Sequence, residues 1–131
     1  MHDEEEYEAT EIRADVDELI YEVDQIESRA ARLGMAMPSE WVAEMCVHHH
    51  AGMQRRIADL YSRAILLRGR CERSVSRMRE IIDRYAWEEI QPMDHYESRS
   101  QRMQRLCADC AQLDQSLVLV RLAIDRLAVI R

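Results

Sequence analysis

The residues with the most obvious capacity for chemistry form one run, Glu44-Met45-Cys46-Val47-His48-His49-His50. On a helix, Cys46 and His50 lie four residues apart on one face, close enough for a thiolate and an imidazole to share a metal ion. A closed site needs a further ligand, which Glu22 or Glu27 could supply. The simpler interpretation makes Cys46 a small core residue and His50 a hydrogen-bonded core histidine. We therefore expect no metal or other cofactor, with Cys46 and His50 the candidates for metal binding or a pH-sensitive contact.

A second candidate is the C-x-x-C formed by Cys107 and Cys110. In redox enzymes this motif opens a helix after a strand. Here it falls inside a predicted helix, and no second C-x-x-C completes a zinc site. Packed, reduced thiols are the favoured interpretation, with Cys71 near Cys110 across the helix pair. Four Cys behind an acidic N-terminus without an apolar signal segment favour a cytoplasmic location.

Arg recurs at every seventh position between residues 56 and 84, and we call these residues the Arg column. Its members are Arg56, Arg63, Arg70, Arg77 and Arg84. An exposed basic stripe can bind phosphates, but single-strand binding also uses interleaved aromatic residues, and only Tyr61 and Tyr85 lie near. The net charge of -7 and the absence of Lys also disfavour nucleic acid. Nucleic-acid binding therefore remains an alternative that requires the acidic first helix to detach.

No catalytic motif is present in the sequence. It contains no Gly-rich phosphate loop, no nucleophile elbow and no H-E-x-x-H. Without Lys there is no Schiff-base chemistry. No apolar run reaches the ~18 residues that a membrane-spanning helix needs. We expect a protein that is not an enzyme and does not bind a membrane.

The composition favours a few long helices, since 33% of residues are charged and only three Gly and two Pro are present. We predict an all-α fold with helices at about 4–33, 40–90 and 95–130, interrupted near Pro38 and Pro92. Short connections predict antiparallel neighbours. The chain would be one elongated coiled-coil domain, residues 1–131, with a very long central helix and a frayed acidic terminus at 1–4.

The predicted core positions are spaced alternately by three and four residues, the heptad pattern of a coiled coil. In the first helix they are Ala9, Ile12, Val16, Leu19, Val23, Ile26, Ala30 and Leu33. In the second they are Met53, Ile57, Leu60, Ala64, Leu67, Cys71, Met78, Ile81 and Tyr85. In the third they are Tyr96, Met103, Leu106, Cys110, Leu113, Leu117, Val120, Ile124 and Leu127.

Charge predicts which helical segments face each other. Residues 1–33 carry twelve acids and three Arg, so the first helix is strongly acidic. Folding it back over the second helix places Glu8 near Arg63, Asp15 near Arg56 and Glu22 near His49. Folding the third helix back places Arg99, Arg102 and Arg105 near Glu88, Asp83 and Glu80, and Asp109 near Arg77. Arg70 and Arg84 meet no acid in this arrangement, so we predict them, with Trp41 and Trp87, as candidate contacts for a partner or a nucleic acid.

The end of the third helix is apolar nearly all round, which one chain cannot bury. We predict self-association, most simply as a two-fold dimer, and a partner helix in the same groove is the alternative. The predicted interface is Ile65, Leu66, Val118, Leu119, Leu122, Ala123, Val129 and Ile130. The function expected is that of a non-enzymatic scaffold, adaptor or regulator that binds another protein. A nucleic-acid-associated protein and a metal- or pH-responsive sensor are the alternatives.

Overall fold

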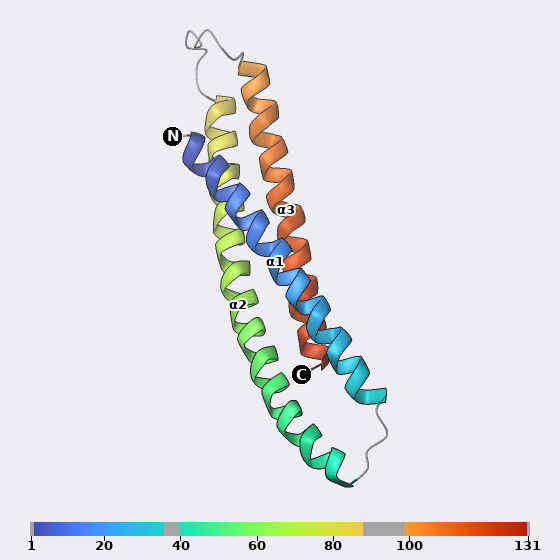
Figure 1. Ribbon diagram of the computed structural model, residues 1–131. Coiled ribbons are helices and arrows are strands. Elements are labelled where there is room, and N and C mark those ends of the chain that lie inside the picture. Colours follow the sequence, from blue (N-terminus) through green and yellow to red (C-terminus); the bar gives the residue numbers. More distant parts are fainter. Residues whose placement is uncertain (1, 36–39, 88–98, 131) are drawn as a thin grey trace.

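The computed structural model describes three helices, α1 (His2–Met35), α2 (Glu40–Trp87) and α3 (Arg99–Ile130) (Figure 1). Side chains are described for residues 7–32, 51–85 and 100–130, and the segments 36–39 and 88–98 lie outside the description. No strand occurs in the described helices, so the all-α prediction is confirmed. The predicted helix ends near residues 90 and 95 fall in the second undescribed segment.

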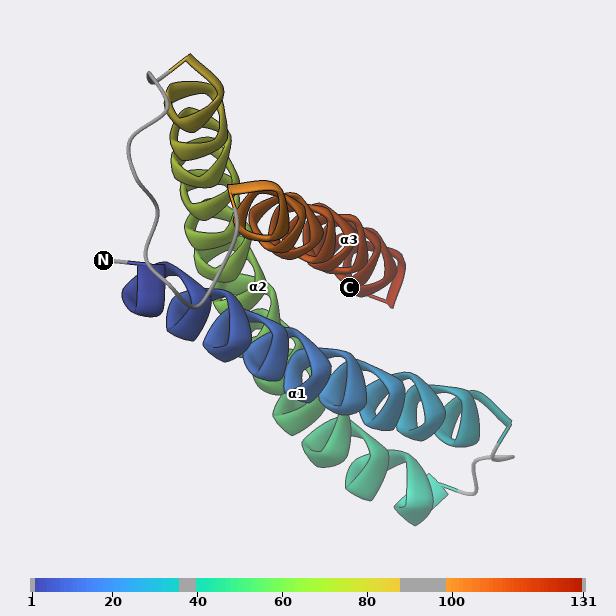
Figure 2. The same ribbon diagram turned by 90° about the horizontal axis from the view of Figure 1, so that it is seen from above.

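Each helix packs against both others (Figures 1 and 2). α1 and α3 run in the same direction, and α2 runs in the direction opposite to both. The first turns of α2 extend beyond the end of α1, and the start of α3 extends beyond the start of α1. The view from above shows the helices around a common centre instead of in one layer. Three side-chain faces therefore meet along the middle of the molecule.

The buried face of α1 follows the predicted spacing. Ile12, Val16, Leu19, Val23 and Ile26 are all at most 4% exposed. Ala9 and Ala30 pack at its two ends and are partly buried. Since burying one large aliphatic side chain contributes about 1.5–3 kcal/mol, these five residues make α1 an integral part of the core.

The buried faces of α2 and α3 contain the central predicted positions and a few more. In α2 the buried residues are Met53, Ile57, Leu60, Ala64, Leu67, Cys71, Ser74, Val75 and Met78. In α3 they are Leu106, Cys110, Leu113, Ser116, Leu117, Val120, Ala123, Ile124 and Leu127. Ser74, Val75, Ser116 and Ala123 were not predicted core positions. They are buried because each helix contacts two others, which widens its inward face beyond a two-helix seam.

The predicted pairing of α1 with α2 is wrong by one to two heptads. Glu22, predicted to face His49, instead pairs with Arg56 and Arg63, which lie seven and fourteen residues farther along α2. Glu8, predicted to face Arg63, pairs with Arg70 and Arg77. A shift by whole heptads keeps the same columns face to face, so apolar contacts and charge signs are preserved. The stagger follows from the first turns of α2, which extend past α1 before the two helices meet.

The axial alignment of α3 with α2 is close to the predicted alignment. The Cys71 thiol donates a hydrogen bond to the Leu113 carbonyl at 3.3 Å. Arg102 lies over the Tyr85 ring, with 5.8 Å from the guanidinium carbon to the ring centroid. Of the Arg residues on α2, Arg79 pairs with Asp114 at 3.1 Å, a pair that was not predicted.

Candidate functional site

The candidate metal ligands cannot be placed, because the side chains of Cys46 and of His48–His50 lie outside the described residues. The same holds for Trp41 and Trp87. Among the side chains that are described, no group of three or more His, Cys, Asp or Glu could hold a metal ion.

Of the three cysteines whose side chains are described, two are buried in the core. Cys71 and Cys110 are buried, and Cys107 is exposed. Burial, reinforced by the charges of Asp114 and Glu72, raises the pKa of the Cys71 thiol to about 11. Burial also raises the pKa of Cys110. Both thiols are protonated at neutral pH, and the protonated form is a poor nucleophile and metal ligand.

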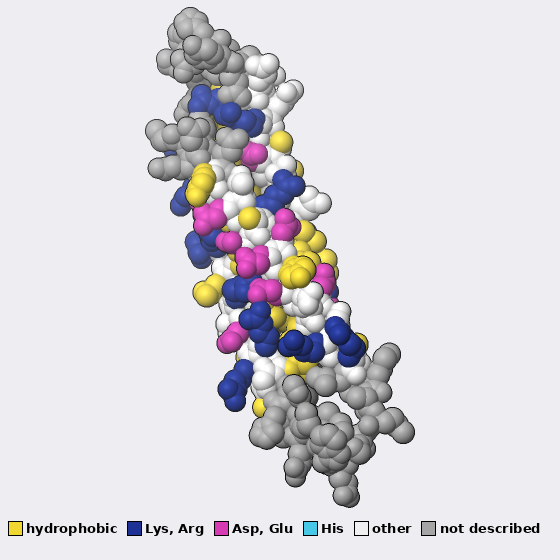
Figure 3. All heavy atoms as spheres, viewed as in Figure 1, with side chains coloured by type: hydrophobic (Ala, Val, Ile, Leu, Met, Phe, Trp, Pro, Cys, Tyr) yellow, Lys and Arg dark blue, Asp and Glu magenta, His cyan; other side chains and the backbone are white. Residues whose placement is uncertain are grey.

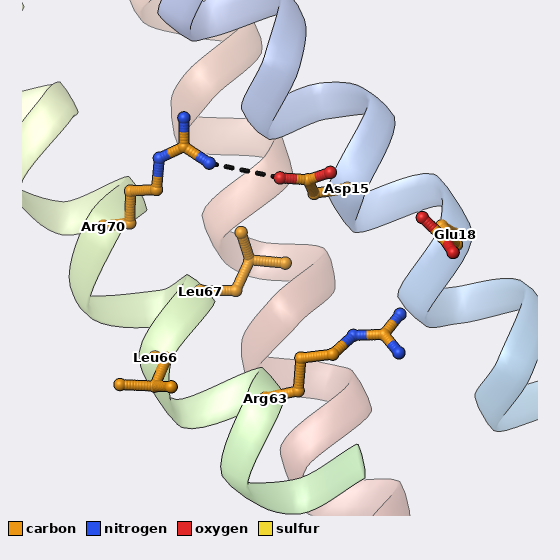
Figure 4. Close-up of a pocket in the computed structure, with 6 residues that line it drawn as sticks. All are labelled: Asp15, Glu18, Arg63, Leu66, Leu67 and Arg70. Carbon is orange, nitrogen blue, oxygen red and sulfur yellow. Dashed lines mark hydrogen bonds and ion pairs between the residues drawn. The ribbon is translucent and has the colours of Figure 1, made fainter. Parts of the chain in front are cut away.

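Four members of the Arg column, Arg56, Arg63, Arg70 and Arg77, form ion pairs with acidic residues of α1. Arg70 lies 3.1 Å from Asp15 (Figure 4). It also lies 3.2 Å from Glu11 and 3.9 Å from Glu8. The prediction that Arg70 meets no acid is therefore wrong, because the heptad shift brings three carboxylates to it. Arg84 is exposed, and its use by a partner remains a prediction.

A shallow groove of about 440 Å³ separates the outer sides of α1 and α2 (Figure 4). Its lining consists of Asp15, Glu18, Arg63, Leu66, Leu67 and Arg70. Both Arg residues of the lining are already in ion pairs with α1. The lining contains no Ser, Cys or His, and of its two carboxylates that of Asp15 is paired with Arg70.

Glu22 is the carboxylate most enclosed by the Arg column. One of its oxygens accepts a hydrogen bond from Arg56 at 2.6 Å, and the other pairs with Arg63. Burial raises the pKa of this carboxyl, but the hydrogen bonds and charges of Arg63 and Arg56 outweigh burial and leave the pKa below its ordinary value. The charged form of Glu22 is therefore favoured in the folded protein.

A pH titration of stability should show this preference. Because the folded-state pKa of Glu22 is lowered, its contribution is present above the unfolded-state pKa of about 4.3 and disappears as pH falls through the folded value. We expect Glu22→Gln to lower the free energy of unfolding by about 1 kcal/mol at pH 7 and to match the wild type only once the pH is below the lowered folded-state pKa of Glu22. The control is Glu18→Gln, since Glu18 is exposed. A Glu22→Gln difference that stays constant with pH would contradict the pairing.

The outer face of α3 carries exposed apolar side chains. The exposed fractions are 53% for Val118, 36% for Leu119, 52% for Leu122 and 86% for Val129. We call these four residues the α3 stripe. Val118, Leu122 and Val129 are spaced by four and seven residues, which places them on one side of the helix, opposite Val120, Ile124 and Leu127 in the core. Figure 3 shows surface hydrophobic side chains gathered on the α1–α3 side at about mid-height.

Four residues of the predicted interface lie elsewhere. Ala123 is only 1% exposed and belongs to the core. Ile65 and Ile130 are partly buried and pack against the core. Leu66 is 74% exposed but lines the groove between α1 and α2. In each case the turn of about 100° per residue moves the side chain away from the face that its sequence neighbours occupy.

Tyr21 of α1 is an exposed aromatic residue that the sequence analysis did not select. It is 64% exposed. Two contacts show how α1 and α3 are aligned: Arg13 contacts Gln112, and Arg126 contacts Asp24. A residue of α1 therefore lies level with the residue of α3 whose number is 99 to 102 higher. Tyr21 thus lies level with residues 120–123 of α3. The seven-residue spacing of Tyr7, Ala14 and Tyr21, outside the core positions, was the available signal.

Two further properties are the capacity of the helices to cross a membrane and the similarity of the chain to known proteins. None of the described helices combines the length and apolar character that crossing a bilayer requires. Searches against protein-family models, curated proteins and solved structures found no match to this chain.

Proposed function

We propose that this chain is a non-enzymatic scaffold, adaptor or regulator that binds another protein, and that it assembles with itself through the α3 stripe. We further propose that its helices pack as an antiparallel coiled coil with heptad spacing, and that it acts in the cytoplasm. The core spacing supports the coiled coil, and the free thiols of Cys71, Cys107 and Cys110 suit a cytoplasmic location.

The proposal rests on one observation: α3 presents apolar side chains on two opposite faces. Its inward face supplies core residues such as Val120, Ile124 and Leu127, while its outward face exposes Val118, Leu122 and Val129. Single exposed apolar residues are normal on proteins. A contiguous stripe of them marks an interaction surface or an aggregation liability.

Neither alternative function gains comparable support. Arg56, Arg63, Arg70 and Arg77 all form ion pairs with carboxylates of α1, which leaves the Arg column a poor phosphate site. The sensor hypothesis depends on Cys46 and His50, whose side chains lie outside the described residues. We therefore propose neither function.

The test is the mass of Leu122→Glu in solution. We expect the wild type to sediment above its 15.5 kDa chain mass and Leu122→Glu to sediment as a monomer, because a carboxylate in the stripe opposes burial. Leu66→Glu is the matched control, since Leu66 is exposed but lies in the α1–α2 groove. Circular dichroism should show the same helix content in all three proteins. If Leu122→Glu retains the wild-type mass, the α3 stripe is not the interface.

A further inference from the structure

We infer that the occupant of the α3 stripe is a second copy of the chain, held antiparallel about a two-fold axis near residue 123, with Arg121 of each copy opposite Asp125 of the other. This inference rests on the proposed function and specifies the partner and its orientation. It follows from the distribution of apolar and charged side chains along the outer side of α3.

Three of the four residues of the α3 stripe are placed almost symmetrically about residue 123, and the fourth, Leu119, has no counterpart. Val118 lies five residues before this point, Val129 lies six residues after it, and Leu122 lies beside it. An antiparallel pair centred there brings Val118 of one copy against Val129 of the other, twice, with the two Leu122 side chains meeting near the axis. Such self-complementarity is what a two-fold interface requires.

The charged residues around Leu122 have the same symmetry with opposite signs. Arg121 lies two residues before residue 123 and Asp125 two residues after it, and both are exposed. Neither forms an ion pair with any residue whose side chain is described. In the antiparallel dimer, each Arg121 lies level with Asp125 of the second copy, which gives two reciprocal ion pairs.

The same charges disfavour the parallel arrangement. In a parallel two-fold pair, each residue lies level with its own copy, so Arg121 would approach Arg121 and Asp125 would approach Asp125. Like charges in register oppose association, and charges that flank an apolar seam commonly select helix orientation. Charge complementarity therefore points both to a second copy as the partner and to its antiparallel orientation.

Tyr21 is an exposed aromatic side chain at the level of the proposed interface. It lies level with residues 120–123, and thus close to the level of the proposed axis, on the adjacent helix α1. The stripe itself spans twelve residues, about 18 Å of helix, which is short against interfaces that bury about 800 Å² per partner. We therefore expect a dimer whose population depends on concentration in the micromolar range.

Charge reversal tests the ion pairs directly. We expect Arg121→Asp and Asp125→Arg each to weaken dimerisation by about tenfold or more, since each replaces two attractive pairs per dimer with two repulsive ones. The double variant restores opposite charges and should return to within about threefold of the wild type. Arg73→Asp and Asp83→Arg are matched controls on exposed positions of α2, and they should leave the dissociation constant unchanged. A double variant as weak as the single variants would overturn the arrangement.

Disulfide crosslinking gives an independent test of orientation. In a Cys107→Ser background, we expect oxidation of mixed Val118→Cys and Val129→Cys proteins to yield linked dimers, identified by mass spectrometry of the joined peptides. Neither protein alone should link through its new Cys, because in the antiparallel dimer the two copies of residue 118 are about 15 Å apart along the helix, beyond the reach of a disulfide. Linking of each protein with itself, and not with the other, would show a parallel dimer and overturn the inference.

These results separate the inference from the proposed function. If Leu122→Glu does not change the mass, both are wrong. If Leu122→Glu gives monomers but the double charge reversal fails to restore dimers, self-association through the stripe stands and only the antiparallel arrangement is wrong.

Discussion

Ala123→Glu should unfold the protomer or lower its free energy of unfolding by at least about 3 kcal/mol, because it places an unpaired carboxylate in the core. Ala123 is 1% exposed, whereas its neighbour Leu122 is 52% exposed. The same residue, Glu, introduced at position 122 should leave the protomer folded. Urea denaturation followed by circular dichroism, at concentrations where the protein is monomeric, measures the difference.

The control for this substitution is Ala108→Glu, because Ala108 is an exposed alanine on the same helix. Its free energy of unfolding should lie within about 0.5 kcal/mol of the wild type, the range usual for surface changes. If Ala123→Glu is as stable as Ala108→Glu, the inward face of α3 is assigned wrongly.

Leu60→Ala should destabilise the protein by about 2–5 kcal/mol, whereas Leu66→Ala should change its stability by less than about 0.5 kcal/mol. Leu60 is 1% exposed and packs in the core, and Leu66 is 74% exposed. The two substitutions remove the same atoms from the same helix, six residues apart. Helix propensity and composition therefore cancel, and the comparison isolates the cavity that truncation leaves at position 60.

If Leu60→Ala and Leu66→Ala lowered the free energy of unfolding equally, Leu66 would have to be buried in the species measured. Repeating the comparison at several protein concentrations would show whether that burial arises from association. A loss at Leu66 that grows with concentration would place this residue in an interface, contrary to its position in the α1–α2 groove.

The sequence was sufficient to predict the helices and the centre of their core. Alternating spacings of three and four residues are a local property, and they placed Ile12, Val16, Leu19, Val23 and Ile26 on one face without knowledge of the partners. Few Gly and Pro left long helices as the simplest way to fold the chain. These features depend on residues within two or three turns of each other.

The pairing level of α1 and α2 could not be predicted in the same way. Acids at positions 8, 15 and 22 and Arg residues at positions 56, 63, 70 and 77 share a spacing of seven. A slide by one or two heptads therefore leaves opposite charges together, and the Coulomb energy of exposed pairs differs little between the alternatives. The core packing of all three helices distinguishes these levels, and it cannot be read from the repeat of charges.

The interface remains a prediction, and only the exposure of its residues can be compared with the structure. The excess of apolar residues at the end of α3 is a compositional signal, and four of the eight proposed interface residues are exposed on its outer face. Ala123 was placed wrongly because a helix that contacts two neighbours buries a wider face than a two-helix seam does. Leu66 was grouped with Ile65 by sequence proximity, although one residue of helix rotates the side chain by about 100°.

The most direct test of self-association is sedimentation equilibrium of the unmodified chain across a concentration series. The α3 stripe predicts a mass that rises from 15.5 kDa toward twice that value as the concentration reaches tens of micromolar. A single species of 15.5 kDa throughout the series, with full helix content, would contradict the account.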